Sequence, residues 1–196
     1  RNQKRIVNQT DSMKSAYLGP CFENSHITKY LEENNVPFKK MSAKEINNVI
    51  IKKIINGEVI GWFQGRMEFG PRALGNRSII GDPRIPDMQK KMNLKIKNRE
   101  SFRPFAPVIL EEFKNEYFGL KINSPYMLLT RNLSKKFLNK VDKNSDLQGL
   151  NKVNEIRSSI PAITHIDNSC RVQTLSKKNN PRFYSLLKDF YTSTSC

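Results

Sequence analysis

The strongest local signal in the sequence is a helix start at Ser42 that leads almost directly into an apolar strand. Ser42 followed by Glu45 is a capping-box pattern, in which the two residues satisfy each other's backbone at a helix N-terminus. Apolar residues then recur at helical spacing over 46–54, and Gly57 lies just past the expected end. The short apolar run at 58–63 has the composition of a buried strand. A helix that feeds a strand indicates a mixed α/β chain.

The remaining segments continue this mixed pattern. We expect further helices at 26–35, 86–96, 111–119 and 181–191, and further strands at 77–82, 104–110 and 126–130. Residues 162–167 and 171–175 flank a turn at Asn168 and Ser169, which predicts a β-hairpin. Two segments lack such a pattern: we expect an arm or linker at 1–15, and the polar stretch 131–159 predicts no defined element.

Composition narrows the class of protein. With 34 Lys and Arg against 18 Asp and Glu, the formal net charge is +16, which favours binding of phosphates, nucleic acid or anionic surfaces. The three cysteines are isolated and the two histidines are far apart, which disfavours a disulfide framework and a zinc site. No apolar run approaches the roughly 20 residues of a membrane helix, and the N-terminus lacks a signal-like segment, so a cytoplasmic location is expected.

The segment 65–79, GRMEFGPRALGNRSI, places Arg66, Arg72 and Arg77 among three glycines, directly after the expected strand at 58–63. Ligands of open α/β sheets bind beyond strand ends, and guanidinium groups hold phosphate or carboxylate oxygens in fixed geometry. Over residues 66–103, ten basic residues outnumber four acidic ones. This mixture suits a small polyanion. Two plainer alternatives remain open: solvated surface charge, and a structural network in which Glu68 and Asp82 pair some of three arginines, Arg77, Arg84 and Arg99.

Two other segments carry polar residues that suit a site. Lys97 and Arg103 flank the polar loop KNRESFR, which leads into the expected strand at 104–110. THIDNSCRVQT at 164–174 contains four polar residues at alternate positions, which sends them to one sheet face: His165, Asp167, Arg171 and Gln173. His–Asp acid–base chemistry and a hydrogen-bonded hairpin both fit this pattern. The usual nucleotide-loop and serine-hydrolase motifs are absent from the sequence.

Taken together, these blocks resemble the C-terminal domain of the O-carbamoyltransferases, a family that includes nodulation and antibiotic-tailoring enzymes. The resemblance rests on GWFQGRMEFGPRALGNRSII, DPR at 82–84, KNRESFRPFAPVIL and THIDNSCRVQT, and extends more weakly over residues 16–196. It implies an α/β fold of the α+β type, YrdC-like, with a twisted mixed sheet, flanking helices and a basic concave pocket. Residues 1–15 would then be a linker or the end of a Kae1-like domain, and residues 16–196 a YrdC-like domain truncated at its C-terminus, before an apolar strand of the family.

The resemblance also implies a chemistry. The domain would bind carbamoyl phosphate and ATP with Mg²⁺ and form a carbamoyl-adenylate, releasing pyrophosphate. A Kae1-like domain with Fe²⁺ or a similar metal would pass the carbamoyl group to a hydroxyl-bearing small molecule or sugar. By position in the family blocks, Lys97, Arg103 and Arg72 are the expected catalytic residues. The expected substrate-binding residues are Arg171, Arg66, Asn76, Ser78, His165, Asp167 and Gln173, and no metal ligands are expected in this domain.

Two alternatives to an enzyme domain remain. The YrdC-like fold also serves transfer-RNA modification, so an RNA-binding module is the first alternative, and a catalytically silent interaction domain is the second. Single-strand binders interleave aromatic residues with their basic ones. Here only Phe69, Phe102 and Phe105 lie among the arginines, which disfavours nucleic acid as the partner.

Overall fold

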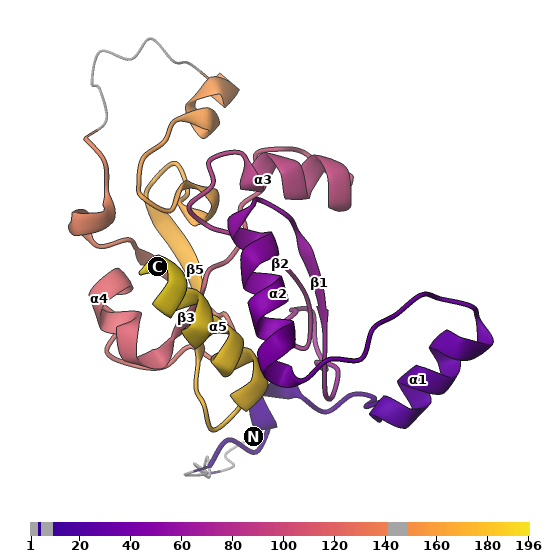
Figure 1. The fold of residues 1–196 in the computed structure, drawn as a ribbon. Coiled ribbons are helices and arrows are strands. Elements are labelled where there is room, and N and C mark those ends of the chain that lie inside the picture. The colour runs from indigo at the N-terminus through magenta and orange to yellow at the C-terminus, as the bar shows by residue number, and fades with distance from the viewer. Residues whose placement is uncertain (1–3, 5–9, 141–148) are drawn as a thin grey trace.

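The computed structural model describes residue 4 and residues 10–140 and 149–196, and its strands form two sheets (Figure 1). In the first, β1 (Ile60–Phe63) pairs antiparallel with β2 (Arg77–Ile80). The second has the order β3-β5-β4 and comprises β3 (Val108–Leu110), β4 (Leu129–Asn132) and β5 (Ser169–Leu175). Because β5 runs parallel to β3 and antiparallel to β4, the second sheet is mixed.

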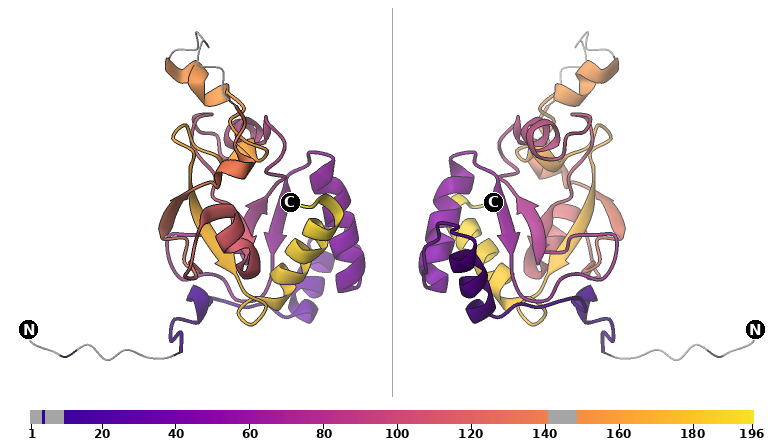
Figure 2. Two further views of the ribbon diagram at one scale, coloured as in Figure 1. Left: turned by 90° about the vertical axis from the view of Figure 1, so that its left-hand side faces the viewer. Right: turned by 90° about the vertical axis from the view of Figure 1, so that its right-hand side faces the viewer.

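The described chain also contains α-helices. They are α1 (Asn24–Glu33), α2 (Ala43–Ile55), α3 (Met88–Lys91), α4 (Lys114–Phe118) and α5 (Pro181–Thr194). Helices α2 and α5 lie side by side (Figures 1 and 2), and the Asn47 amide of α2 donates a 2.7 Å hydrogen bond to Asp189 of α5. Helix α1 has no buried residue and stands away from the sheets (Figure 1). No described helix is long and apolar enough to cross a membrane.

The predicted α+β class is confirmed, with the strands divided between two sheets instead of one. Helix α2 begins with the predicted capping box, in which Ser42 and Glu45 exchange side-chain to backbone hydrogen bonds of 2.8 and 3.4 Å. The helices predicted at 26–35 and 181–191 are confirmed as α1 and α5. The helix predicted at 86–96 is α3 continued by a π-helical turn over Met92–Ile96, and that at 111–119 is a 3₁₀ turn over Glu111–Phe113 followed by α4.

The strands at 58–63 and 77–82 are confirmed by β1 and β2. Strand β3 is shorter than the run predicted at 104–110, and β4 begins three residues after the predicted start at 126. The described residues of the polar stretch 131–159 contain 3₁₀ turns over Lys135–Phe137 and Gly149–Asn154. Residues 141–148 of that stretch, and 1–3 and 5–9 of the predicted arm, lie outside the described residues.

The predicted hairpin over 162–175 is wrong. Residues 161–163 form a 3₁₀ turn, and β5 pairs with β3 and β4 instead of with the segment before it. The turn itself is present: the His165 carbonyl accepts the Asn168 N–H, and the His165 N–H donates to the Ser169 carbonyl. Asn168 has φ 63°, a left-handed conformation that asparagine tolerates better than most residues.

The two larger apolar clusters of the described residues hold the elements together. One packs the inner face of β5 against β3 and α4, with Val172 fully buried at its centre. The other packs α2 and α5 on β1, with Ile54, Trp62 and Phe183 buried. Alternation along β5 sends Val172 into the first cluster and leaves Arg171 and Gln173 on the opposite face. This opposite face is where β5 meets the arginine-rich loop.

Candidate functional site

The loop between β1 and β2 carries the first group of predicted site residues, and a buried carboxylate organises it. Glu68 Oε1 accepts the backbone N–H groups of Leu74, Asn76 and Arg77 at 2.6, 2.8 and 3.3 Å. The predicted pairing of Glu68 with arginine side chains is therefore wrong. Converging backbone N–H dipoles stabilise an anion much as a cation does, and a fold that supplies them holds the loop in one shape.

The carbonyl groups of the same loop are also held by side chains. The Leu74 carbonyl accepts hydrogen bonds from the Tyr17 hydroxyl and the Gln173 amide, each of 2.8 Å. Tyr17 belongs to the N-terminal segment, which also pairs with the loop through the Gly19 N–H and the Met67 carbonyl at 2.9 Å. Segments from opposite ends of the chain thus meet at one peptide group.

Gly75 occupies the tightest point of this loop. Its carbonyl accepts hydrogen bonds from the indole of Trp62 and the amide of Gln64, each of 2.9 Å. Its φ of 105° lies in a region that side chains disfavour, and the Phe183 ring fills the space beside it. Only glycine fits both constraints.

Two residues predicted to bind substrate use their side chains inside this loop. The Asn76 amide is buried: its Oδ1 accepts from the Asn180 amide at 2.9 Å, and its Nδ2 donates to the Arg66 carbonyl at 2.7 Å. The Ser78 hydroxyl accepts the Gly75 N–H at 3.0 Å. In this structure both side chains shape the loop.

Arg72 and Arg171 are brought together, although they lie in different blocks of the sequence. Both are exposed, Arg72 in the loop and Arg171 on β5. Gln173, on the same face of β5 as Arg171, bonds Leu74, two residues after Arg72. Partial burial, and then the positive charge of Arg72, lower the pKa of Arg171. No carboxylate among the described residues pairs with either guanidinium group, so the pair offers two cations to an external anion.

Two neighbouring arginines have structural partners, as the sequence predicted. Arg77 Nη1 donates a 2.6 Å hydrogen bond to the Gln64 carbonyl, and its guanidinium lies 3.6 Å from the centre of the Phe63 ring. Arg84 forms a two-pronged contact with the carboxylate of Asp82, with a shortest distance of 2.6 Å. Asp82 is fully buried, so Arg84 supplies the charge that it needs.

Lys97 and Arg103 lie at the two ends of a turn built around the buried side chain of Asn93. Asn93 Nδ2 donates to the Arg103 carbonyl at 2.8 Å, and its Oδ1 accepts from Arg99 Nε at 2.6 Å. Arg99 therefore has a structural partner, which is Asn93 and not Glu68 or Asp82 as the sequence suggested. Lys97 is exposed, and Arg103 pairs with Glu100 at 2.9 Å on the surface. No hydrogen bond or ion pair in the described part of the chain joins this turn to Arg72.

The remaining predicted site residues lie at the surface. Arg66 Nη1 donates to the Gly19 carbonyl at 3.1 Å. His165 Nδ1 lies 3.5 Å from Asp167 Oδ1, with the two side chains 40% and 67% exposed. Hydrogen bonds from Ser169 lower the pKa of Asp167. Within the described ranges, no three His, Cys, Asp or Glu side chains converge as metal ligands.

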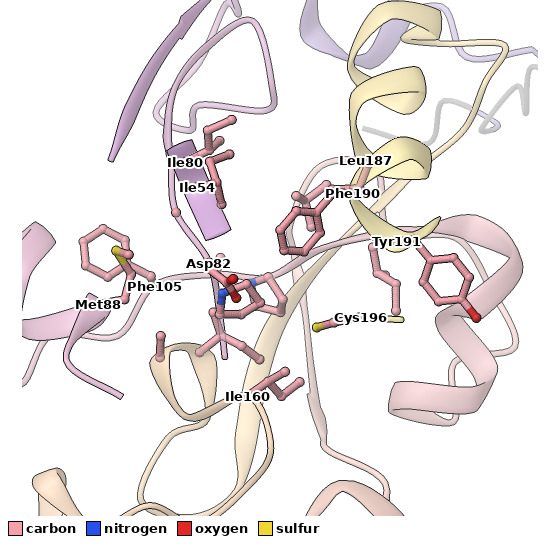
Figure 3. Close-up of a pocket in the computed structure, with 18 of the residues that line it drawn as sticks. Ile54, Ile80, Asp82, Met88, Phe105, Ile160, Leu187, Phe190, Tyr191 and Cys196 are labelled. Carbon is pink, nitrogen blue, oxygen red and sulfur yellow. The ribbon is translucent and has the colours of Figure 1, made fainter. Parts of the chain in front are cut away.

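A cavity of about 180 Å³ lies between the two sheets (Figure 3). Its walls come from β2, β3, α2 and α5 and are apolar, with Ile54, Ile80 and Phe190 among the lining residues. Asp82 is the one charged residue among the described residues that line it. This cavity is therefore not the expected basic pocket, and neither Arg72 nor Arg171 lines it.

Sequence reasoning missed the residues that hold the loop. Asn180 stands before Pro181 and caps α5, since its Oδ1 accepts the Phe183 N–H at 3.2 Å. An asparagine before a helix-initiating proline is a readable capping signal. Gln64 and Tyr17 carry no comparable signal, because their partners are backbone groups distant in the sequence.

The structure has a mixed α+β fold and two exposed arginines that form a candidate anion site, and comparison with known proteins identifies the family. Residues 51–196 match the family model described as Carbamoyltransferase C-terminus. The chain belongs to this family, which groups transferase domains.

Curated relatives support the same family assignment. The chain is 48% identical over 196 residues to the uncharacterized protein sll1178 of Synechocystis sp., covering 98% of the chain and 32% of that protein. It is 38% identical to nodulation protein NolO of Bradyrhizobium diazoefficiens, covering 94% and 31%. It is 35% identical to the 3'-hydroxymethylcephem-O-carbamoyltransferase of Amycolatopsis lactamdurans, covering 70% and 22%. The chain thus spans about a third or less of the length of these relatives.

Proposed function

We propose that this chain is the donor-binding domain of an O-carbamoyltransferase and that Arg72 and Arg171 bind the phosphate oxygens of carbamoyl phosphate. The observation that carries the proposal is the Gln173–Leu74 hydrogen bond, which joins β5 to the β1–β2 loop two residues from each of these exposed arginines. The charge of Arg72 also acts on Arg171, whose pKa it lowers. Guanidinium groups bind phosphate oxygens through charge-assisted hydrogen bonds, and two groups on separate elements fix the orientation of one small anion.

ATP is the proposed second substrate, and a carbamoyl-adenylate the proposed product. Water first cleaves carbamoyl phosphate, which releases inorganic phosphate and leaves carbamate. A carbamate oxygen then bonds to the α-phosphorus of ATP while the bond from that phosphorus to pyrophosphate breaks, and pyrophosphate leaves. Both reacting groups are anionic, so preorganised cations lower the barrier by offsetting repulsion and developing charge. Lys97 and Arg103, at the ends of the turn around Asn93, are proposed to supply further positive charge. Mg²⁺ bound with ATP would neutralise phosphate charge.

The acceptor is proposed to be a hydroxyl group of a small molecule or sugar. The name of one relative gives a hydroxymethyl-cephem as its carbamoyl acceptor. Transfer to the acceptor is assigned to a Kae1-like domain with Fe²⁺ or a similar metal in the longer protein, which we propose to be cytoplasmic. The residues of the present chain would then bind and orient the donor.

Thermal unfolding with and without ligands tests this function. The melting temperature of the chain should rise by several degrees with carbamoyl phosphate, and further when a non-hydrolysable ATP analogue and Mg²⁺ are added. Sulfate at matched ionic strength should give a smaller rise, because it lacks the carbamoyl group. Equal stabilisation by sulfate would contradict the proposal. Salt-dependent RNA binding without any response to carbamoyl phosphate would favour the RNA-binding alternative.

A further inference from the structure

Arg72 and Arg171 repel each other, so something other than their own contacts must keep them close. In a chain without bound anion, like charges are expected to move apart when the backbone allows it. Arg171 is anchored by its strand, since β5 is the central strand of its sheet. Arg72 lies in a loop that follows Gly70 and Pro71, so its position depends on how the loop backbone is held.

Two buried side chains hold that backbone from opposite sides. Gln173 is 3% exposed, and its amide Nε2 donates to the Leu74 carbonyl at 2.8 Å. Glu68 is 6% exposed, and its Oε1 accepts the N–H groups of Leu74 and Asn76 at 2.6 and 2.8 Å. Leu74 is therefore fixed through its N–H by Glu68 and through its carbonyl by Gln173. It follows Arg72 by two residues, and Gln173 follows Arg171 by two residues along β5.

We propose that Glu68 and Gln173 are positioning residues, which hold Arg72 beside Arg171 by fixing the Leu74 peptide groups between them. Neither side chain is assigned a contact with the ligand. The inference rests on the proposed function, because it presumes that Arg72 and Arg171 bind an anion together.

Glu68→Ala distinguishes the two possible roles of Glu68. The loss of its negative charge alone would raise anion affinity, whereas the loss of its position as a hydrogen-bond acceptor would lower it. A carboxylate beside the site repels an anion, so its removal should strengthen anion binding if charge alone matters. If Glu68 positions Arg72, Glu68→Ala should weaken binding although a negative charge is lost. Glu68→Gln keeps an oxygen where all three N–H groups converge, so it should bind at least as tightly as the wild type.

The experiment is calorimetric titration of the 196-residue chain with inorganic pyrophosphate at low, fixed ionic strength. Glu68→Ala and Gln173→Met should each lower the affinity about five- to tenfold, the size expected when a hydrogen bond that orients a charged group is lost. Each change is repeated in an Arg72→Ala background, where it should have no further effect, because the positioned side chain is absent. Circular dichroism and thermal melts give the folded fraction of every variant at the assay temperature.

The results distinguish failure of the proposed anion site from failure of the positioning role alone. Unchanged pyrophosphate affinity in Arg72→Ala would overturn the proposed site itself. Weaker binding in Arg72→Ala, together with tighter or unchanged binding in Glu68→Ala and Gln173→Met, would overturn the positioning role alone. Losses that persist in the Arg72→Ala background would also overturn it, because they would reflect general destabilisation. If Glu68→Ala does not fold, the volume-matched Gln173→Met carries the same test.

Discussion

The ring of Phe183 occupies the space in which a side chain at Gly75 would stand. A Cβ atom at residue 75 would lie 2.5 Å from Cδ1 of that ring, well inside van der Waals contact. Phe183 belongs to α5 and packs on Trp62 of β1, with ring centres 5.9 Å apart. The arginine loop is therefore seated directly on the core, and its geometry depends on how α5 packs.

Gly75→Ala should destabilise the chain strongly. The substitution combines a positive φ of 105° with overpacking against an aromatic ring, and together these should cost about 2–4 kcal/mol of unfolding free energy. Gly61→Ala is the matched control, because that position has space for a methyl group and should change stability by less than about 0.5 kcal/mol. Urea unfolding measures both, and equal effects would refute the packing argument.

Arg84→Met should destabilise the chain, because it leaves the buried Asp82 carboxylate without a cation. Asp82 is fully buried and paired with Arg84 at 2.6 Å, so removal of the cation leaves a charge without a partner and should cost about 3 kcal/mol. Adding Asp82→Asn should recover much of that loss. Lys136→Ala breaks a half-exposed pair with Glu116 and should cost less than about 1 kcal/mol. Chemical denaturation compares the variants, and a similar loss in both single variants would argue against this view.

The three cysteines should differ sharply in reactivity. Burial raises the pKa of Cys170 to about 12 and that of Cys196 to about 11, while Cys21 is exposed. Because the thiolate is the reactive form, iodoacetamide at pH 8 should modify Cys21 first and leave Cys170 protected until the chain unfolds. A raised thiol pKa favours the folded state below the unfolded value and loses that contribution as pH rises toward 12. Mass spectrometry of timed samples reads the order, and early labelling of Cys170 would contradict it.

Lys97→Ala and Arg103→Ala should reduce the thermal stabilisation by carbamoyl phosphate with the ATP analogue, while leaving the ligand-free melting temperature nearly unchanged. Both side chains lie on the surface, where loss of the Arg103–Glu100 pair has little effect on folding. Full ligand stabilisation in both variants would remove this turn from the proposed site.

Elements that depend on local sequence were predictable. The capping box, apolar spacing and terminal glycine defined α2, because a helix satisfies its backbone within its own segment. The partners of β5 were not predictable in the same way. Strand pairing is a choice between distant segments, and the turn at Asn168 suggested a local partner that the chain does not use.

The candidate site also contains features that the sequence predicted and features that it did not. The residue types predicted an anion site, which stays a prediction. The expected pairing of Arg84 with Asp82 is confirmed, whereas Arg77 bonds the Gln64 carbonyl and Arg99 bonds Asn93. The use of Glu68 and Gln173 was hidden, because both bind backbone groups whose positions depend on the folded loop. The chemistry of a side chain can be read from the sequence. Its backbone hydrogen-bond partners are known only once the fold is known.

Calorimetric titration of single variants with carbamoyl phosphate measures whether Arg72 and Arg171 bind this donor. Arg72→Ala and Arg171→Ala should each weaken binding about ten- to a hundredfold, the range expected when a charge-assisted hydrogen bond is lost. Lys52→Ala, which removes an exposed charge on α2, should leave the affinity unchanged. Equal affinities for the wild type and both arginine variants would contradict the account.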